Sequence, residues 1–344
     1  MEFLFDYGLF FAKALTIVIA IVFVFGAILT LGHRQKSDNG GHIEITNLNE
    51  KYNEQRDSLK IVVQSEAELK AESKRNKKIE KAEKKYKHKD GPLKKRLYVL
   101  NFDGDIKASA TDNMREAISA ILTMARSEDE VLLKLESGGG MVHSYGFASS
   151  QLKRITKKGI RLTVAVDKVA ASGGYMMACV ANHIIAAPFA VIGSIGVVAQ
   201  IPNFSRLLTD NKIDFELLTA GEHKRTLTMF GENTDEGRKK FIEELEDTHT
   251  LFKSFVSEHR PQVEIAGVAT GEVWYGERAL NKNLVDELET SDTYIMQAIE
   301  TADVYQIEFV HQKSWQEKLG FAAEATAERT LLKIWQQVSS KPKV

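Results

Sequence analysis

The chain has 344 residues, of which 43% are hydrophobic, and its formal net charge is −1 at neutral pH. This length and composition suit a globular protein with a large buried core and allow two domains. The near-neutral charge argues against a general attraction to nucleic acid. The single cysteine, Cys179, excludes an internal disulfide or a cysteine-based metal cluster.

An uncharged run of nineteen residues, 14–32, lies close to the N-terminus. As a helix rising ~1.5 Å per residue it would span roughly 28 Å, close to the hydrocarbon thickness of a bilayer. A cleaved signal peptide is the alternative, but its apolar region would be shorter and a small-residue cleavage site would follow. Here Arg34 and Lys36 follow instead. We therefore expect residues 1–36 to form an uncleaved membrane anchor.

Residues 37–96 show no sustained apolar face and are rich in Lys, Glu, Asn and Gln. Between Lys70 and Arg96 there are thirteen Lys or Arg residues against four Asp or Glu residues. Helix-forming residues and i,i+4 charge pairs predict a solvated, partly helical stalk. Its basic part would contact anionic lipid headgroups or serve only as a soluble spacer.

Beyond the stalk, short apolar runs alternate with helical patterns, which predicts a largely parallel α/β domain over residues 97–300. Strands are expected at 97–102, 131–136, 160–166, 183–186, 196–200 and 215–218. Helices are expected at 112–125, 143–158, 172–181 and 235–260. Residues 301–344 read as a C-terminal strand and an amphipathic helix, which would pack on a neighbouring protomer or lie on a membrane.

Two glycine-rich turns follow predicted strands and open predicted helices. The first, Ser137-Gly138-Gly139-Gly140, could direct backbone N–H groups at an anion, either a phosphate or a tetrahedral oxyanion. The second places Ser172 before Gly173 and Gly174. A hydroxyl at a helix start is first of all a capping group. It could also be a nucleophile, with the Gly173 N–H contributing to an oxyanion hole.

Lys224 follows Ser172 by 52 residues and has apolar neighbours on both sides in the sequence. A lysine can serve as the base for a serine when desolvation removes its proton. A surface loop lysine is the alternative interpretation. Histidine is the more usual base, so His183 and His223 are the next candidates, although neither has an acidic partner at a recognisable offset.

With these residues the chain resembles the signal peptide peptidase family of serine-lysine proteases, of the protease IV type. The resemblance is strong over residues 97–295 and looser at both ends. The matching segments are LESGGGMV at 135–142, VAASGGY at 169–175, IGSIGV at 192–197, TAGEHKRTL at 219–227 and YGERA at 275–279.

The resemblance implies Ser172 as nucleophile and Lys224 as general base, with Ser194 orienting the Lys224 amine. The oxyanion hole would be formed by backbone N–H groups of Gly173, Gly139 and Gly140. The implied fold is that of the ClpP/crotonase superfamily, with repeated ββα units. Gly138 replaces a proline usual in the family, which would loosen this loop.

The resemblance also implies a homo-oligomer whose protomers share a substrate groove, and no metal or organic cofactor. The implied substrates are signal peptides or other short apolar peptides derived from membranes. The anchor at 14–32 would place the protein in the bacterial inner membrane. Family resemblance favours a periplasmic catalytic domain, whereas the basic residues after the anchor favour the cytoplasm. An acyl-CoA enzyme of the crotonase fold and a non-catalytic membrane scaffold remain alternatives.

Overall fold

The computed structural model describes residues 41–71, 94–221 and 224–310, with a few isolated residues before 41 and between 72 and 93. Apart from Leu15 and Thr16, the expected anchor at 14–32 lies outside the described residues, as does the tail from 311 onward. Among the helices that the described residues form, none combines the length and hydropathy needed to cross a bilayer. The unit considered below is Ile43–Phe309.

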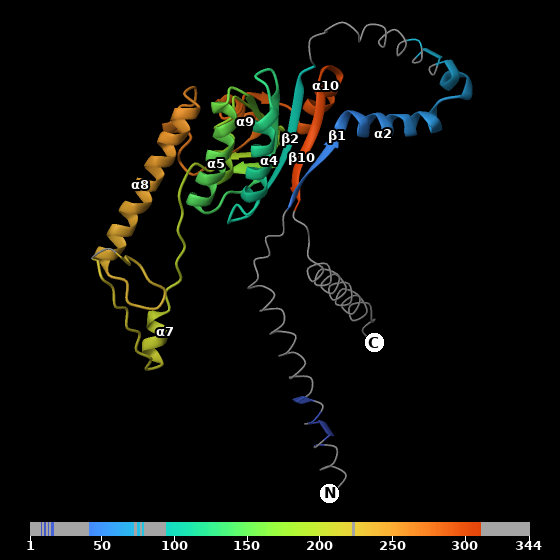
Figure 1. Cartoon of the computed structure of the whole chain (residues 1–344). Coiled ribbons are helices and arrows are strands. Elements are labelled where there is room, and N and C mark those ends of the chain that lie inside the picture. The colour runs from blue at the N-terminus through green and yellow to red at the C-terminus, as the bar shows by residue number, and fades with distance from the viewer. Residues whose placement is uncertain are drawn as a thin grey trace, which may run out of the picture. The chain divides into compact units, whose positions relative to one another are not determined.

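A twisted, mostly parallel sheet forms the centre of this unit, in the strand order β1-β10-β2-β3-β4-β6-β9 (Figure 1). Its strands are β1 (His42–Asn47), β2 (Arg96–Gly104), β3 (Glu130–Ser137), β4 (Arg161–Val166), β6 (His183–Ala186), β9 (Glu287–Leu288) and β10 (Asp303–Val310). Three short strands branch from it: β5 (Val169–Ala171), β7 (Val191–Gly193) and β8 (Val273–Tyr275). β5 pairs with β3 and with β7, and β7 pairs antiparallel with β8.

Alternate residues of the strands point to opposite sides of the sheet, so apolar side chains lie on both faces. Helices cover both of these faces. The helices are α2 (Leu48–Val63), α4 (Thr111–Met124), α5 (Val142–Lys157), α6 (Gly173–Ala178), α7 (Ser205–Asp210), α8 (Asp235–His259), α9 (Gly276–Asn281) and α10 (Ser291–Thr301), with a 3₁₀ turn at Ile265–Gly267. Tyr98, Leu100 and Phe102 of β2 face the large core beneath α4 and α5. Leu97 and Val99 face the smaller core beneath α10.

The structure confirms the mixed α/β prediction. The predicted helix at 172–181 ends at Ala178. The predictions of strands at 196–200 and 215–218 were wrong, since these residues form no strand in the described chain. Their apolar side chains, such as Val198 and Leu218, are exposed rather than buried in the sheet.

Part of the range expected to be a solvated stalk instead joins the sheet. β1 lies beside β10, and Leu48 at the start of α2 is buried. The side chain of Asn49 fixes this junction. Its Nδ2 donates to the carbonyl oxygen of Ala302 at 3.0 Å, and its Oδ1 accepts from the backbone N–H of Val304 at 2.7 Å. A strand held mainly by backbone hydrogen bonds needs few apolar residues, so the hydrophobic pattern gave little sign of it.

Candidate active site

Ser172 occupies the sharp turn between β5 and α6. Its backbone has φ 52° and ψ −118°, a conformation that is costly for a residue with a side chain. Although it is the N-cap residue of α6, its side chain makes no capping hydrogen bond. The side chain is half-buried. The hydroxyl is therefore not used to cap the helix, which removes the simplest structural explanation for a serine at this position.

The glycine loop after β3 lies directly against Ser172. A Cβ added to Gly139, which has φ +88°, would lie 2.8 Å from the Ser172 Cβ and 2.7 Å from the Gly173 nitrogen. A Cβ on Gly140 would lie 2.1 Å from the carbonyl oxygen of Ile106. The two glycine-rich turns predicted to cooperate are thus adjacent, and neither Gly139 nor Gly140 has room for a side chain.

A chain of hydrogen bonds through the buried Ser137 and Tyr145 holds this glycine loop, and no sequence pattern indicated it. The Gly139 N–H donates to the Ser137 Oγ at 3.1 Å, and the Ser137 Oγ lies 2.6 Å from the Tyr145 hydroxyl. Tyr145 in turn donates to the carbonyl oxygen of Asp105 at 2.7 Å. Because the Tyr145 proton is used there, Ser137 is the donor to Tyr145. Because the Gly139 N–H already donates to Ser137, it is not free to bind an oxyanion. The backbone N–H groups of Gly140 and Gly173 remain as the candidate oxyanion donors.

Tyr145 also links the two turns through its ring. A Cβ on Gly173 would lie 2.4 Å from the Tyr145 Cγ, so the ring packs directly on the start of α6. Tyr145 is fully buried, and this burial raises the pKa of its phenol. The side chain is therefore a neutral spacer that fixes the distance between the glycine loop and Ser172.

Ser194 lies beside Ser172, as the strand pairing requires. β5 and β7 run parallel with Ala171 opposite Gly193, and Ser194 follows Gly193 directly. Ser194 also has a positive φ, 51°, and its N–H donates to the carbonyl oxygen of Glu272 at 2.7 Å. A neighbouring residue that the sequence did not single out is His249 of α8, whose Nε2 lies 3.2 Å from the carbonyl oxygen of Ile195.

Ser172 lines a cavity of about 200 Å³ between α5, α6 and α8. Gly140, Gly146, Gly173, Gly196 and Thr248 contribute to its wall. Its apolar lining comes from Val142, Met176, Val197, Leu251, Phe252 and Phe255. The cavity offers an apolar environment next to a hydroxyl and next to two backbone N–H candidates.

Lys224 lies on an exposed arm, which we define as the described residues of 197–234. Its side chain is exposed, its backbone N–H donates to the carbonyl oxygen of Gly221 at 3.2 Å, and it does not line the cavity at Ser172. The neighbouring Leu217 and Leu218 are exposed as well. The structure thus brings Ser172, Ser194 and the glycine turns together, but not Lys224.

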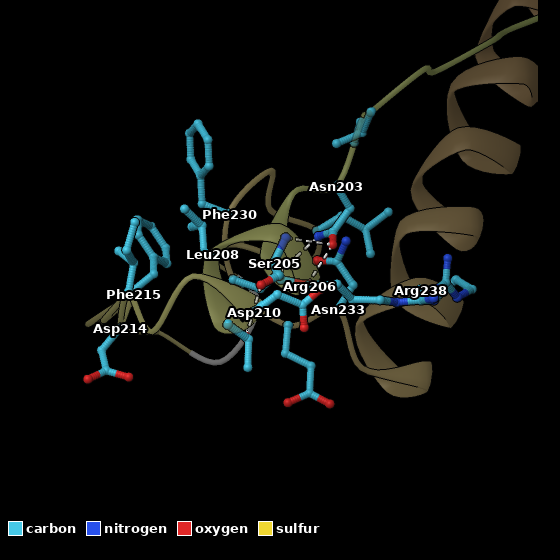
Figure 2. A pocket seen from close by; sticks show the side chains of 16 residues that line it. Asn203, Ser205, Arg206, Leu208, Asp210, Asp214, Phe215, Phe230, Asn233 and Arg238 are labelled. Carbon is cyan, nitrogen blue, oxygen red and sulfur yellow. Dashed lines mark hydrogen bonds between the residues drawn. The ribbon is translucent and has the colours of Figure 1, made fainter.

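The arm has its own internal order (Figure 2). The Asn203 amide donates to the carbonyl oxygens of Thr228 and Gly231 at 2.9 and 3.0 Å, and the Phe230 ring lies 6.1 Å from that of Phe204. A cavity of about 820 Å³ lies here, lined by residues such as Arg206 and Arg238. It is larger than the cavity at Ser172 but includes neither Ser172 nor Lys224. Figure 1 shows α7 at the end of the arm, away from the strands.

The other candidate residues lie elsewhere. His183 begins β6 and lies near Asp286 and Glu287, at 3.7 and 3.3 Å, while His223 lies outside the described residues. Cys179 is buried, and burial raises the pKa of its thiol, so it remains a protonated core residue. Within the described ranges, no three His, Cys, Asp or Glu side chains are grouped so as to hold a metal ion.

A serine freed from capping, in a strained strand-to-helix turn beside backbone N–H donors, is the arrangement of hydrolases that use a serine nucleophile. Comparison with known proteins is consistent with this class. The family description Peptidase family S49 N-terminal matches residues 2–152, and Peptidase family S49 matches residues 154–305.

Two relatives match along most of their length. The chain is 52% identical over 330 residues to a probable protease SohB of Haemophilus influenzae, covering 93% of each chain. It is 50% identical over 307 residues to a probable protease SohB of Buchnera aphidicola subsp. Schlechtendalia chinensis, covering 86% of this chain and 99% of the relative. The chain therefore belongs to peptidase family S49, which confirms the resemblance seen in its motifs, and it is a protease.

Among solved structures, the fold is similar to that of the 1510-N membrane-bound stomatin-specific protease, in a variant bound to a substrate peptide. The TM-score is 0.41 at 14% sequence identity, and the match covers 66% of this chain and 96% of the other. A second structure of the same protease gives a TM-score of 0.38 at 15% identity.

Proposed function

We propose that the protein is a serine endopeptidase in which Ser172 is the nucleophile and Lys224 the general base. The observation that carries this proposal is the Ser172 side chain, which caps no helix and lies at the wall of an apolar cavity beside Gly140 and Gly173. Ser194, adjacent to Ser172 through the β5–β7 pairing, would orient the lysine amine.

The reaction follows from these roles. Lys224 accepts the proton of the Ser172 hydroxyl as the oxygen attacks the scissile carbonyl carbon. The backbone N–H groups of Gly140 and Gly173 stabilise the negative charge that develops on the carbonyl oxygen. The protonated lysine then protonates the leaving amine, and an acyl-enzyme on Ser172 remains. Water, deprotonated by the same lysine, hydrolyses this ester and restores the serine.

Lys224 must approach Ser172 for this chemistry, and the arm is the element that would carry it. The arm exposes large apolar side chains that include Leu207, Ile213, Leu217 and Leu218. Such a surface is suited to packing against protein rather than water. We therefore propose a homo-oligomer in which the arm of a neighbouring copy covers the cavity and delivers Lys224.

The proposed substrates are signal peptides or other short apolar peptides derived from membranes. The apolar lining of the cavity at Ser172, with Met176 and Phe252 among its residues, supports an apolar side chain next to the scissile bond. We further propose that residues 14–32 anchor the chain in the bacterial inner membrane by a single span, with the catalytic domain in the periplasm.

The ClpP/crotonase-like architecture also belongs to this proposal. In support, β4 is followed by the short branching strand β5 and by α6, and β6 is followed by the branching β7. In both cases a strand of the main sheet leads into a short strand that leaves it. This repetition places Ser172 and Ser194 at equivalent points, one after each branching strand.

The test is cleavage of a fluorogenic apolar peptide by the full-length chain in mild detergent. Wild type, Ser172→Ala and Lys224→Ala are compared, with circular dichroism to establish folding. We expect both variants to be folded and inactive, and wild-type activity to rise with pH because the base must be neutral. An active Lys224→Ala variant would move the role of base to another residue, such as His249, whose Nε2 lies 3.2 Å from the carbonyl oxygen of Ile195.

Mixing the two inactive variants tests how the arm delivers Lys224. If a neighbouring copy supplies the lysine, co-assembled Ser172→Ala and Lys224→Ala chains recover activity, since some sites combine an intact serine with an intact lysine. No recovery, despite oligomers that exchange subunits, would assign the lysine to the same chain as its serine.

A further inference from the structure

Gly146 is a glycine inside α5 without a packing role among the described residues. It lies five positions into the helix, where glycine is less favourable than alanine because it loses more backbone freedom on folding. A Cβ at this position would meet no heavy atom of the described chain within 4 Å, its own stretch of helix aside. Close packing therefore does not explain the missing side chain.

Two other glycines nearby show what a packing role looks like. A Cβ on Gly173 would lie 2.4 Å from the Tyr145 ring, and one on Gly104 would lie 2.5 Å from the Ser137 Oγ. Each of these positions is closed by a neighbouring side chain. The open space at Gly146 is different in kind, since it faces a cavity instead of a packed neighbour.

The cavity that Gly146 faces is the one that contains Ser172. Its volume is about 200 Å³, and apolar cavities of ~150 Å³ are large enough to hold a benzene ring. The walls opposite are apolar side chains of α6 and α8, including Met176, Phe252 and Phe255. A group bound here must therefore be apolar and must lie beside the Ser172 hydroxyl.

We propose that Gly146 determines the size of the substrate side chain bound next to the scissile bond. Its missing side chain leaves room for a leucine or phenylalanine side chain, while an alanine or larger residue at position 146 would narrow the cavity. This inference rests on the proposed function of Ser172, and it assigns the primary specificity of that site to one position of α5.

The first test measures kcat/KM for peptides that differ only in the residue before the scissile bond, alanine, leucine or phenylalanine. We expect wild type to prefer leucine and phenylalanine. Gly146→Leu should lower kcat/KM for these two peptides about tenfold or more, in line with the effect of altered fit in an apolar pocket. Cleavage of the alanine peptide should persist. Gly146→Ala should give a smaller shift in the same direction and an equal or higher Tm.

The matched control is Ser150→Leu, which adds the same side chain to the same helix at an exposed position outside the cavity lining. It should keep the wild-type preference. An unchanged preference in Gly146→Leu, or an equal change in Ser150→Leu, would overturn the proposal.

A second measurement separates this inference from the proposed catalytic mechanism. Binding of the same labelled peptides to Ser172→Ala, with and without Gly146→Leu, is followed by fluorescence anisotropy. Weaker binding of the leucine peptide in the double variant, with the alanine peptide unchanged, supports the size-determining role even if Ser172 proves not to be the nucleophile. Equal binding of all peptides to both variants contradicts it.

Discussion

The backbone N–H of Ser172 donates a hydrogen bond of 2.7 Å to the carbonyl oxygen of Gly193. This bond extends the β5–β7 pairing by one residue and places Ser172 next to Ser194. Both serines have an uncommon positive φ, 52° and 51°. Such conformations persist only where the surrounding structure enforces them, and they cluster at functional sites. Two serines with positive φ side by side therefore support the proposal that this turn is the functional centre.

The strain at Ser172 predicts a difference between two inactive variants. Ser172→Gly and Ser172→Ala both lack the hydroxyl, but only glycine adopts positive φ without a steric penalty. We expect Ser172→Gly to be more stable than Ser172→Ala by about 1 kcal/mol or more. Chemical denaturation followed by circular dichroism measures this. Equal stabilities would mean that the turn relaxes when the hydroxyl is removed.

The glycine loop predicts opposite outcomes at two neighbouring positions. A Cβ on Gly139 would clash with Ser172 and Gly173, and its φ of +88° disfavours alanine. A Cβ on Gly138 would meet no described atom within 4 Å, and its φ is not positive. We expect Gly139→Ala to lose peptidase activity and stability. Gly138→Ala should keep activity and gain up to ~1 kcal/mol, because it restricts the unfolded chain.

These two variants are assayed side by side for peptide cleavage and for the midpoint of urea unfolding. A Gly138→Ala variant that is as inactive as Gly139→Ala would show that the loop requires freedom of movement rather than space.

Tyr145→Phe tests whether the buried hydrogen-bond chain positions the glycine loop. The phenylalanine keeps the ring against Gly173 but leaves the Asp105 carbonyl and the Ser137 hydroxyl without their partner. Leaving the buried Ser137 hydroxyl without this partner destabilises the protein by about 1–3 kcal/mol. We expect a lower kcat with a nearly unchanged KM, because the cavity wall remains intact. A change confined to KM would argue for a contact with substrate instead.

Asp129 predicts a loss of stability in acid. Burial by itself would raise the pKa of this carboxyl, but hydrogen bonds from Arg96 and Arg126 lower the pKa from 3.8 to about 2. A lowered pKa stabilises the folded state above the unfolded pKa, and this contribution disappears as the pH falls through the folded value. The contribution of Asp129 to the free energy of unfolding amounts to about 2 kcal/mol and should be lost between about pH 4 and pH 2.

The measurement is the free energy of unfolding at a series of pH values for wild type and Asp129→Asn. The variant should be less stable than wild type at pH 7 and should converge with it near pH 2. A constant difference across this range would contradict the lowered pKa.

The sequence predicted the strands and helices that have strong hydrophobic patterns, such as β2, β3 and α8. It also predicted that Ser172 would lie in a strand-to-helix turn, because glycines and a preceding apolar strand are local signals. It did not predict Tyr145, whose role depends on contacts with Asp105, Ser137 and Gly173 from three other segments. The apolar residues around Lys224 suggested a buried lysine, but hydrophobic neighbours in sequence do not reveal what covers them.

The position of β1 has a consequence for the behaviour of the isolated protease. β10 pairs with β2 on one side, and β1 occupies its other side. A fragment that began after Asn47 would keep Ser172 but would leave the backbone N–H and C=O groups of β10 open. An unpaired strand of this kind is a template for intermolecular pairing. We therefore expect such a fragment to aggregate more readily than a chain that keeps the short N-terminal strand, whose residues include the polar His42 and Glu44.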